Sequence, residues 1–324
     1  MKAPIFKKWF ARLFALNQPQ RMQTLAALHP AAGLDRVIAL IGQIGAVARR
    51  CPRCTSARHY RHGHANHLQR YRCRDCGRTF NDLSGTPLAR LRMREKWLDY
   101  LGALRESKAV RTAAVDVGVH RNTAFRWRHR FLDRVKHDQP QRLHGIVEAD
   151  EMFILESQKG SRKLDRAPRK RGGKASKRGI SNELDCILVG RDRSRQTIGA
   201  LVGRGALKVA QLARHLLPKL DKEVLLVSDS NAAYRAFARQ YGIAHQAVNL
   251  QAGQRMHRDA GRALHVQSVN AYHQRLRQWL AQFHGVASRY LPNYLGWHRA
   301  LDGERLTSVE QLLRIAIRVI NTKW

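Results

Sequence analysis

Two aspartates lie in apolar segments typical of buried strands: Asp150 in VEADEMFIL and Asp229 in EVLLVSDS. Carboxylate oxygens are the ligands that hard cations such as Mg²⁺ prefer. Two such ions can clamp the attacking and leaving oxygens of a phosphodiester in line. A single aspartate in a strand would mean little, but two in apolar runs indicate metal-dependent phosphodiester chemistry. Side chains alternate along a strand, so Glu148 should share the face of Asp150 and Glu151 should point the other way.

A third carboxylate is missing, because no Asp or Glu occurs between Asp259 and Asp302. Asn270, in HVQSVNAYHQRLRQW, is the candidate replacement, since an amide oxygen can be a neutral ligand. Gln274 and Arg277 follow it at i+4 and i+7 and should share its helical face. Two alternatives stay open: Asn270 could be a helix N-cap, and Glu148 would then be the next candidate ligand.

Two C-x-x-C pairs lie 18 residues apart, formed by Cys51 with Cys54 and Cys73 with Cys76. Such pairs can complete a tetrahedron around one cation, so the spacing predicts a structural Zn²⁺ site. The alternative is a site in which an intervening histidine replaces a cysteine. The candidates are His59, His62, His64 and His67. The fifth cysteine, Cys186, lies in an apolar run and is expected in the core.

The charge of the chain is strongly positive, with 60 Lys and Arg against 24 Asp and Glu, a net +36. A folded chain this basic needs a polyanion, and DNA or RNA is the first candidate, ahead of an anionic membrane surface. The longest apolar run, residues 37–48, is too short to span a bilayer. Basic residues interrupt the apolar N-terminus, which makes it a poor signal peptide. We therefore expect a cytoplasmic, nucleoid-associated protein.

The elements that must position the aspartates alternate from residue 144 onward. Three strands in succession are followed by helices alternating with strands, which is the order of an RNase H-like domain. The expected strands are 145–155, 183–193, 196–203, 223–230 and 244–250, and the expected helices are 206–220 and 231–242.

Residues 90–135 read as helices with helix-turn-helix spacing: Ala114, Gly118 at the turn, and Val119 as an apolar anchor. A second helix should start near His120, with Phe125 and Phe131 available for the core. Its exposed face would read DNA in the major groove. The predicted DNA-contacting residues on that face are Asn122, Arg126 and Arg130. The alternative is an ordinary helical hairpin with a basic exterior.

A basic segment, residues 156–180, holds ten Lys or Arg and two acids between the first two strands. We expect a flexible loop near the aspartates that tracks a DNA backbone, with Lys170 and Arg171 as contacts. The alternative is an ordinary basic loop that is only solvated and does not track DNA.

The predicted fold class is therefore a multidomain α/β protein: a zinc ribbon and a helix-turn-helix, followed by an RNase H-like mixed-sheet domain with flanking helices. The expected ranges are an N-terminal helical arm 1–48, the zinc ribbon 49–84, the helix-turn-helix region 85–140 and the catalytic domain 141–324.

Residues from about Cys51 to Arg299 resemble the insertion-sequence transposases that join an N-terminal zinc ribbon to a DDE-type domain. VEADEMFI, LVSDSNAAY and the block from His265 to Trp297 carry the resemblance. It is closest to the subgroup in which Asn replaces the last acid, giving a D-D-N core followed by a basic residue. That residue is usually Lys, and here it is Arg277, which would pair with phosphate through fork geometry.

The resemblance implies a transposase that cleaves element ends and transfers the strands into new DNA. Asp150, Asp229 and Asn270 would bind catalytic Mg²⁺ or Mn²⁺, and Arg277 would contact phosphate. His265 and His273 are expected to be structural or DNA-facing rather than ligands. The expected partners are terminal-repeat and target DNA, with a homodimer or larger synaptic assembly. The alternatives are a DNA-binding protein with an inert nuclease domain and an RNA-processing nuclease.

Overall fold

The computed structural model describes residues 3–170, 172–249, 256–259 and 262–317, and the chain divides into two compact units. The first comprises Met1–Trp127 with Ser308–Trp324, and the second comprises Arg128–Thr307. The division falls inside a helix, α5 (Arg121–Val135), rather than in a loop.

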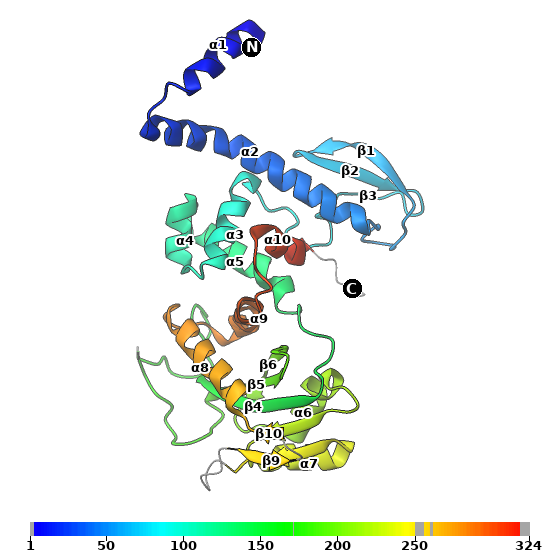
Figure 1. Ribbon diagram of the computed structural model, residues 1–324, viewed down its shortest axis with the longest axis vertical. Coiled ribbons are helices and arrows are strands. Elements are labelled where there is room, and N and C mark those ends of the chain that lie inside the picture. Colours follow the sequence, from blue (N-terminus) through cyan, green and yellow to red (C-terminus); the bar gives the residue numbers. More distant parts are fainter. Residues whose placement is uncertain (1–2, 171, 250–255, 260–261, 318–324) are drawn as a thin grey trace. The chain divides into compact units, whose positions relative to one another are not determined.

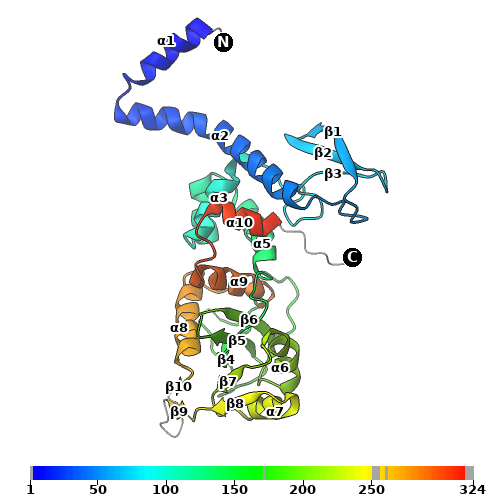
Figure 2. The same ribbon diagram turned by 45° about the vertical axis from the view of Figure 1, so that its right-hand side comes forward.

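The second unit is built on a five-stranded mixed sheet with the strand order β6-β5-β4-β7-β8. Figure 1 labels β4, β5 and β6 of this sheet, and Figure 2 labels all five strands. Strands β4, β7 and β8 are parallel, whereas β5 is antiparallel to both β4 and β6. The predicted α/β class with a mixed sheet is confirmed. The strands are β4 (Ile146–Leu155), β5 (Leu184–Asp192), β6 (Thr197–Arg204), β7 (Leu225–Ser228) and β8 (Ala244–Ala247). A short hairpin, β9 (His257–Asp259) and β10 (Arg262–Leu264), follows them.

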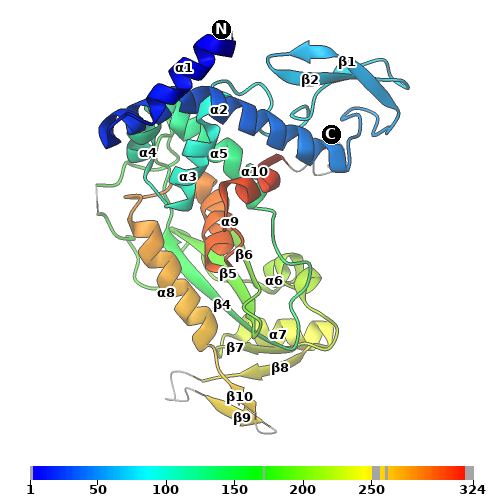
Figure 3. The same ribbon diagram turned by 45° about the horizontal axis from the view of Figure 1, so that its top comes forward.

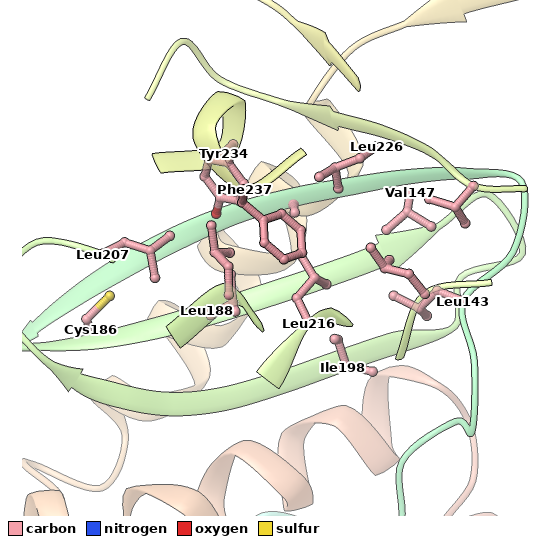
Figure 4. Packing of buried hydrophobic residues seen from close by; sticks show 14 residues of the cluster. Leu143, Val147, Cys186, Leu188, Ile198, Leu207, Leu216, Leu226, Tyr234 and Phe237 are labelled. Atoms are coloured by element: carbon pink, nitrogen blue, oxygen red, sulfur yellow. The ribbon is translucent and has the colours of Figure 1, made fainter. Parts of the chain in front are cut away.

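Helices cover both faces of this sheet. Figure 2 shows α6 (Val209–His215) and α7 (Ala232–Tyr241) on one face and α8 (Gln267–Ala281) on the other. Strand β4 is apolar on both sides, because Val147 and Ala149 belong to the cluster under α6 and α7 while Met152 belongs to the cluster under α8. In the first cluster, Tyr234 and Phe237 of α7 pack among leucines of the sheet (Figure 4). Buried Cys186 of β5 lies in the same cluster, as predicted.

An aromatic cluster holds α8 against α9 (Leu291–Asp302). The ring centroid of Trp279 lies 4.9 Å from that of Trp297 and 4.8 Å from that of Phe283. Tyr294 packs against both Trp279 and Phe283. The rings fix how α8 lies against α9, because aromatic contacts of this kind are directional as well as apolar.

The end of α5 is fixed to α9 within the second unit. The buried guanidinium of Arg299 donates to the carbonyl oxygens of Val135, Lys136 and Asp138 at 3.1–3.4 Å. These are carbonyls at and just beyond a helix end, which cations stabilise. A Cβ at Gly296 would lie 2.4 Å from Cα of Lys136, so only glycine allows this approach.

The first unit contains the other helices and a small sheet. Helices α1 (Ala3–Leu13) and α2 (Gln18–Val47) lead to the antiparallel strands β1 (His59–Ala65), β2 (Leu68–Cys73) and β3 (Thr79–Phe80). A 3-10 turn, η1 (Arg94–Lys96), precedes α3 (Trp97–Arg105) and α4 (Val110–Val117). Arg49 pairs with Asp82 at 2.7 Å and lies over the ring of Tyr71, which fastens the small sheet to the end of α2.

Helix α10 (Val309–Ile317) also belongs to the first unit, where it packs against α2 and α3 and Arg36 pairs with Glu310. The sequence places α10 in the range 141–324 expected for the catalytic domain. The helix instead packs within the first unit. The sequence of an amphipathic helix shows which of its faces is buried, but it does not show which surface covers that face. Within the described residues, no helix combines the length and the apolar character needed to cross a bilayer.

Candidate functional site

The register of β4 and β7 brings the two predicted aspartate ligands together. In this parallel pair Ala149 lies opposite Ser228, and the next residues along the two strands are Asp150 and Asp229. Neighbouring strands are about 4.8 Å apart, so the two carboxylates are attached to adjacent positions of the backbone.

Asp229 is fixed by the turn that opens α7. Its Oδ1 accepts a hydrogen bond from the backbone N–H of Asn231 at 3.0 Å, and Asn231 caps α7 by accepting from the backbone N–H of Ala233. Burial raises the pKa of Asp229, and the charge of Asp150 raises it further. Two carboxylates that repel each other in a half-buried place are a suitable donor set for a divalent cation.

Glu148 docks the start of α8 on the sheet. Its Oε2 accepts hydrogen bonds from the backbone N–H groups of Ser268 at 2.8 Å and Val269 at 3.0 Å. Its Oε1 lies 3.1 Å from Nη1 of Arg193 and 3.2 Å from Nδ1 of His265. Glu148 does share the face of Asp150. Its Oε2 is engaged by the start of α8, whereas its Oε1 is buried and has these two ion-pair contacts but no hydrogen-bond partner among the described residues. Glu148 therefore stays the alternative third ligand.

Asn270 lies inside α8, which runs along β4 (Figure 3). Its backbone N–H bonds to the carbonyl of Val266, the residue at the N-cap position, so the N-cap alternative for Asn270 is wrong. One turn later, Nδ1 of buried His273 lies 3.5 Å from Oδ2 of Asp150. Half-buried Asn270 therefore lies on α8 between the residues that bond to Glu148 and the histidine that contacts Asp150. Arg277, further along the same helix, is exposed.

Glu151 points to the other face of the sheet, as predicted, and forms a network that the sequence did not reveal. Its Oε1 accepts from Nδ2 of Asn231 at 2.7 Å, and its Oε2 accepts from the hydroxyl of buried Tyr234 at 3.0 Å. Burial raises the pKa of Glu151 to about 7, with a further contribution from Asp150. Through Asn231 this network supports the turn that holds Asp229.

Comparison with known proteins shows what the segment that carries this site is similar to. Residues 142–297 match the family model described as the ISXO2-like transposase domain. A protein described as "Uncharacterized protein in transposable element ISH50", from Halobacterium salinarum, is 29% identical over 255 residues, which cover 76% of this chain and 82% of that protein. The predicted resemblance to insertion-sequence transposases is confirmed.

Solved structures of the Mos1 transposase are more distant from this chain. A pre-cleavage transpososome is 16% identical, with 63% of this chain and 78% of that chain covered and a TM-score of 0.19. The strand transfer complex is 15% identical, covers 64% and 76%, and has a TM-score of 0.21.

The four predicted cysteine ligands of the first unit fit a zinc ion. Tetrahedral Zn²⁺ with Zn–S bonds of about 2.3 Å needs sulfurs about 3.8 Å apart. Sγ of Cys51 lies 3.6 Å from Sγ of Cys76, and Sγ of Cys54 lies 3.5 Å from Sγ of Cys73. The backbone N–H of Cys76 is the main cause that lowers the pKa of Cys73 to about 7, which favours a thiolate.

Across the residues described, these cysteines are the one group of three or more His, Cys, Asp or Glu side chains close enough to share an ion. The four intervening histidines are outside it, which argues against a His-substituted site. Among the described residues, Asp150 and Asp229 belong to no such group.

Helix α5 carries two of the predicted DNA contacts in exposed positions, directly after α4. Helix α4 ends at Gly118 with φ +64°, and Asn122 and Arg126 are exposed on α5. Arg130 is half-buried. Phe131 is fully buried as predicted, but the core expectation for Phe125 is wrong, because Phe125 is 40% exposed. The buried stripe of α5 instead runs through Ala124, Trp127 and Phe131.

The basic loop of the second unit, residues 156–180, forms no helix or strand in its described part. Lys170 is exposed on it, whereas Arg171 lies outside the described residues. Three other basic side chains of the loop, Lys159, Arg166 and Arg169, form hydrogen bonds with other residues of the second unit.

Proposed function

We propose that the protein is a transposase that binds the terminal repeats of an insertion sequence, cleaves the DNA ends and transfers the 3′-OH to target DNA. The observation that carries the proposal is the pair Asp150 and Asp229 on adjacent strands of an ISXO2-like transposase domain. The strand order, with β5 antiparallel at the second position, supports an RNase H-like fold. Its work on chromosomal DNA would be cytoplasmic.

Asp150, Asp229 and Asn270 would hold Mg²⁺ or Mn²⁺. When bound, such ions stabilise the charge on the attacking and leaving oxygens of the phosphodiester. The donor set fits, since it consists of carboxylate and amide oxygens, which hard cations prefer. Water would attack the scissile phosphorus and leave a 3′-OH, whose oxygen then attacks a target phosphodiester and displaces a new 3′-OH. Arg277, exposed on α8, would pair with a nearby phosphate.

DNA recognition would use the other parts of the chain. The cysteine cluster would hold structural Zn²⁺ in a zinc ribbon, and α4 with α5 would act as a helix-turn-helix whose Asn122, Arg126 and Arg130 face DNA. Lys170 and Arg171 would contact the backbone from the basic loop. Because two element ends must be joined, the working form would be a homodimer or a larger synaptic assembly.

The proposal is tested with labelled duplexes carrying the terminal repeats that flank the coding sequence. The expected products are Mg²⁺-dependent nicks at the repeat boundary and covalent joining of the new 3′ ends to a target plasmid. Tight binding without any nick in Mg²⁺ or Mn²⁺ would favour the inert DNA-binding alternative.

Asn270→Ala should lower end cleavage by about a hundredfold or more while leaving end binding intact, because it removes one metal ligand. Asn270→Asp should retain activity and change the preference between Mg²⁺ and Mn²⁺, since it restores an anionic oxygen at nearly the same place. The measurement is the single-turnover cleavage rate across a metal titration. Gln278→Ala, at an exposed amide of the same helix, is the matched control. Wild-type rates for Asn270→Ala at every metal concentration would remove Asn270 from the site.

Arg126→Ala should weaken binding to element ends. If Arg126 reads a guanine, about 1–3 kcal/mol of discrimination should be lost. If it contacts only phosphate, binding to all sequences should weaken together and the salt slope should flatten by about one unit. Gel-shift titrations at several salt concentrations separate the two, with Arg214→Ala on the exposed surface of α6 as control. No change in either quantity would exclude Arg126 from the DNA contact.

A further inference from the structure

The basic loop divides its cations into two groups. Lys159, Arg166 and Arg169 are bonded to the transposase domain. Six others are exposed, and their side chains have no hydrogen bond or ion pair with any described residue: Arg162, Lys163, Lys170, Lys174, Lys177 and Arg178. A merely solvated basic loop would show no such division.

Glu156 is the main attachment point. It follows the last residue of β4, and it is 3% exposed. Its Oε2 accepts from Nε of Arg166 at 3.0 Å and lies 3.4 Å from Nη1 of Arg169, while its Oε1 accepts from Arg204 of β6 at 3.1 Å. A buried carboxylate is tolerated only with such partners, so the loop arginines and Glu156 hold each other in place.

Two further contacts hold the loop at other points. Glu183 accepts hydrogen bonds from the backbone N–H of Ser176 at 2.6 Å and from Arg169 at 3.1 Å. At the start of the loop, Ser157 and Ser288 exchange hydrogen bonds of 2.8 Å. The lysines between these contacts, Lys170 and Lys174, are therefore carried on a chain that is fixed on both sides.

The loop also leaves the sheet near the predicted catalytic residues. Glu156 is six positions after Asp150, so at about 3.3 Å per residue the loop begins about 20 Å along the strand from Asp150. DNA rises about 3.4 Å per base pair, so this is roughly six base pairs. A duplex that runs from Asp150 toward this end of β4 would pass the exposed cations.

We infer that Glu156 is a positioning residue for DNA binding: it holds the basic loop as a preformed surface for the phosphate backbone of duplex DNA. This inference rests on the proposed function. A free loop would lose conformational entropy on binding, whereas a held loop has already lost it. Glu156 thus strengthens binding to DNA, although its negative charge alone would weaken it.

A charge effect and a positioning effect change the DNA affinity in opposite directions. The test therefore compares Glu156→Gln with Glu223→Gln in the full-length protein on a random-sequence duplex. Both variants remove one negative charge, but Glu223 is exposed and its side chain bonds to no described residue. If charge alone matters, both variants should bind DNA up to about twofold more tightly. If Glu156 positions the loop, Glu156→Gln should bind about threefold to tenfold more weakly. Its salt slope should then flatten by about 0.9 for each phosphate that the loop no longer reaches.

Hydrogen exchange supplies a readout that is independent of DNA. Glu156→Gln should speed exchange in residues 157–182 while β4 and β5 stay protected, and Glu223→Gln should not. Glu183→Gln, at a partly exposed position, should change DNA binding and hydrogen exchange in the same directions by a smaller amount. Equal or tighter DNA binding by Glu156→Gln and Glu183→Gln would overturn the inference. Wild-type protein that binds duplex DNA but never cleaves it would overturn the proposed catalysis and leave this inference standing.

Discussion

Replacing Asp229 with asparagine is expected to lower metal-dependent end cleavage by at least about a thousandfold, and Asp150→Asn should do the same. A thousandfold lower rate corresponds to about 4 kcal/mol of lost transition-state stabilisation. This agrees with the several kcal/mol that a bound cation supplies. The measurement is the single-turnover rate of nicking a labelled end. Binding to that end should persist, since each change removes a negative charge.

The loss should not come from unfolding. Burial and the charge of Asp150 raise the pKa of Asp229, so in the absence of a cation its ionised form is unfavourable in the fold. An amide oxygen can also keep the hydrogen bond from the N–H of Asn231. Asp229→Asn should therefore have an unchanged or higher Tm without metal, and it should lose the rise in Tm that Mg²⁺ gives to the wild type. Cleavage within tenfold of wild type by either variant would contradict the assigned roles.

The second large effect concerns zinc. Purified protein should contain one tightly held Zn²⁺ per chain, and the double change Cys73→Ser, Cys76→Ser should abolish it and unfold residues 51–80. The apolar cluster of this sheet holds only four buried residues: Cys51, Tyr71, Cys73 and Phe80. So small a core cannot replace the roughly 10–16 kcal/mol that structural zinc contributes in such modules. Elemental analysis and hydrogen exchange of this segment measure the effect.

Cys186→Ala is the matched control for zinc. Cys186 is buried in β5 of the second unit, and burial raises the pKa of its thiol to about 12, so it is not available as a thiolate ligand. Zinc content and protection of residues 51–80 should stay at wild-type values. Equal protection of that segment in the double serine variant would show that zinc does not hold the fold.

The sequence predicted the strands that carry the two aspartates well, because the signal for a strand is local. Apolar runs bounded by polar turns gave β4, β5 and β7 within two residues of their observed ends at most positions. The alternation rule also placed Glu148 and Glu151 on the correct faces. Local patterns do not predict which residues from distant parts of the sequence come into contact. The docking of α8 on Glu148 and the contact of His273 with Asp150 were therefore missed.

Charge composition was a weaker guide, because it does not say which cations are exposed. The net charge of +36 suggested a DNA-binding surface, yet Arg128 and Arg299 are buried in the second unit. Arg128 lies over the ring of Trp297, and Arg299 bonds to carbonyls at the end of α5. In the basic loop, Arg166 and Arg169 pair with Glu156 through contacts that no local pattern announces. Counting basic residues therefore overestimates the surface that DNA can use.

The most direct measurement is the anomalous scattering of a crystal soaked in Mn²⁺, which shows where a catalytic cation binds. We expect a peak between Asp150 and Asp229, with carboxylate oxygens at about 2.1–2.2 Å and the side-chain oxygen of Asn270 facing it. The peak should vanish in Asp229→Asn crystals. No peak in the wild type, or one whose ligands exclude Asp150 and Asp229, would contradict the proposed metal site.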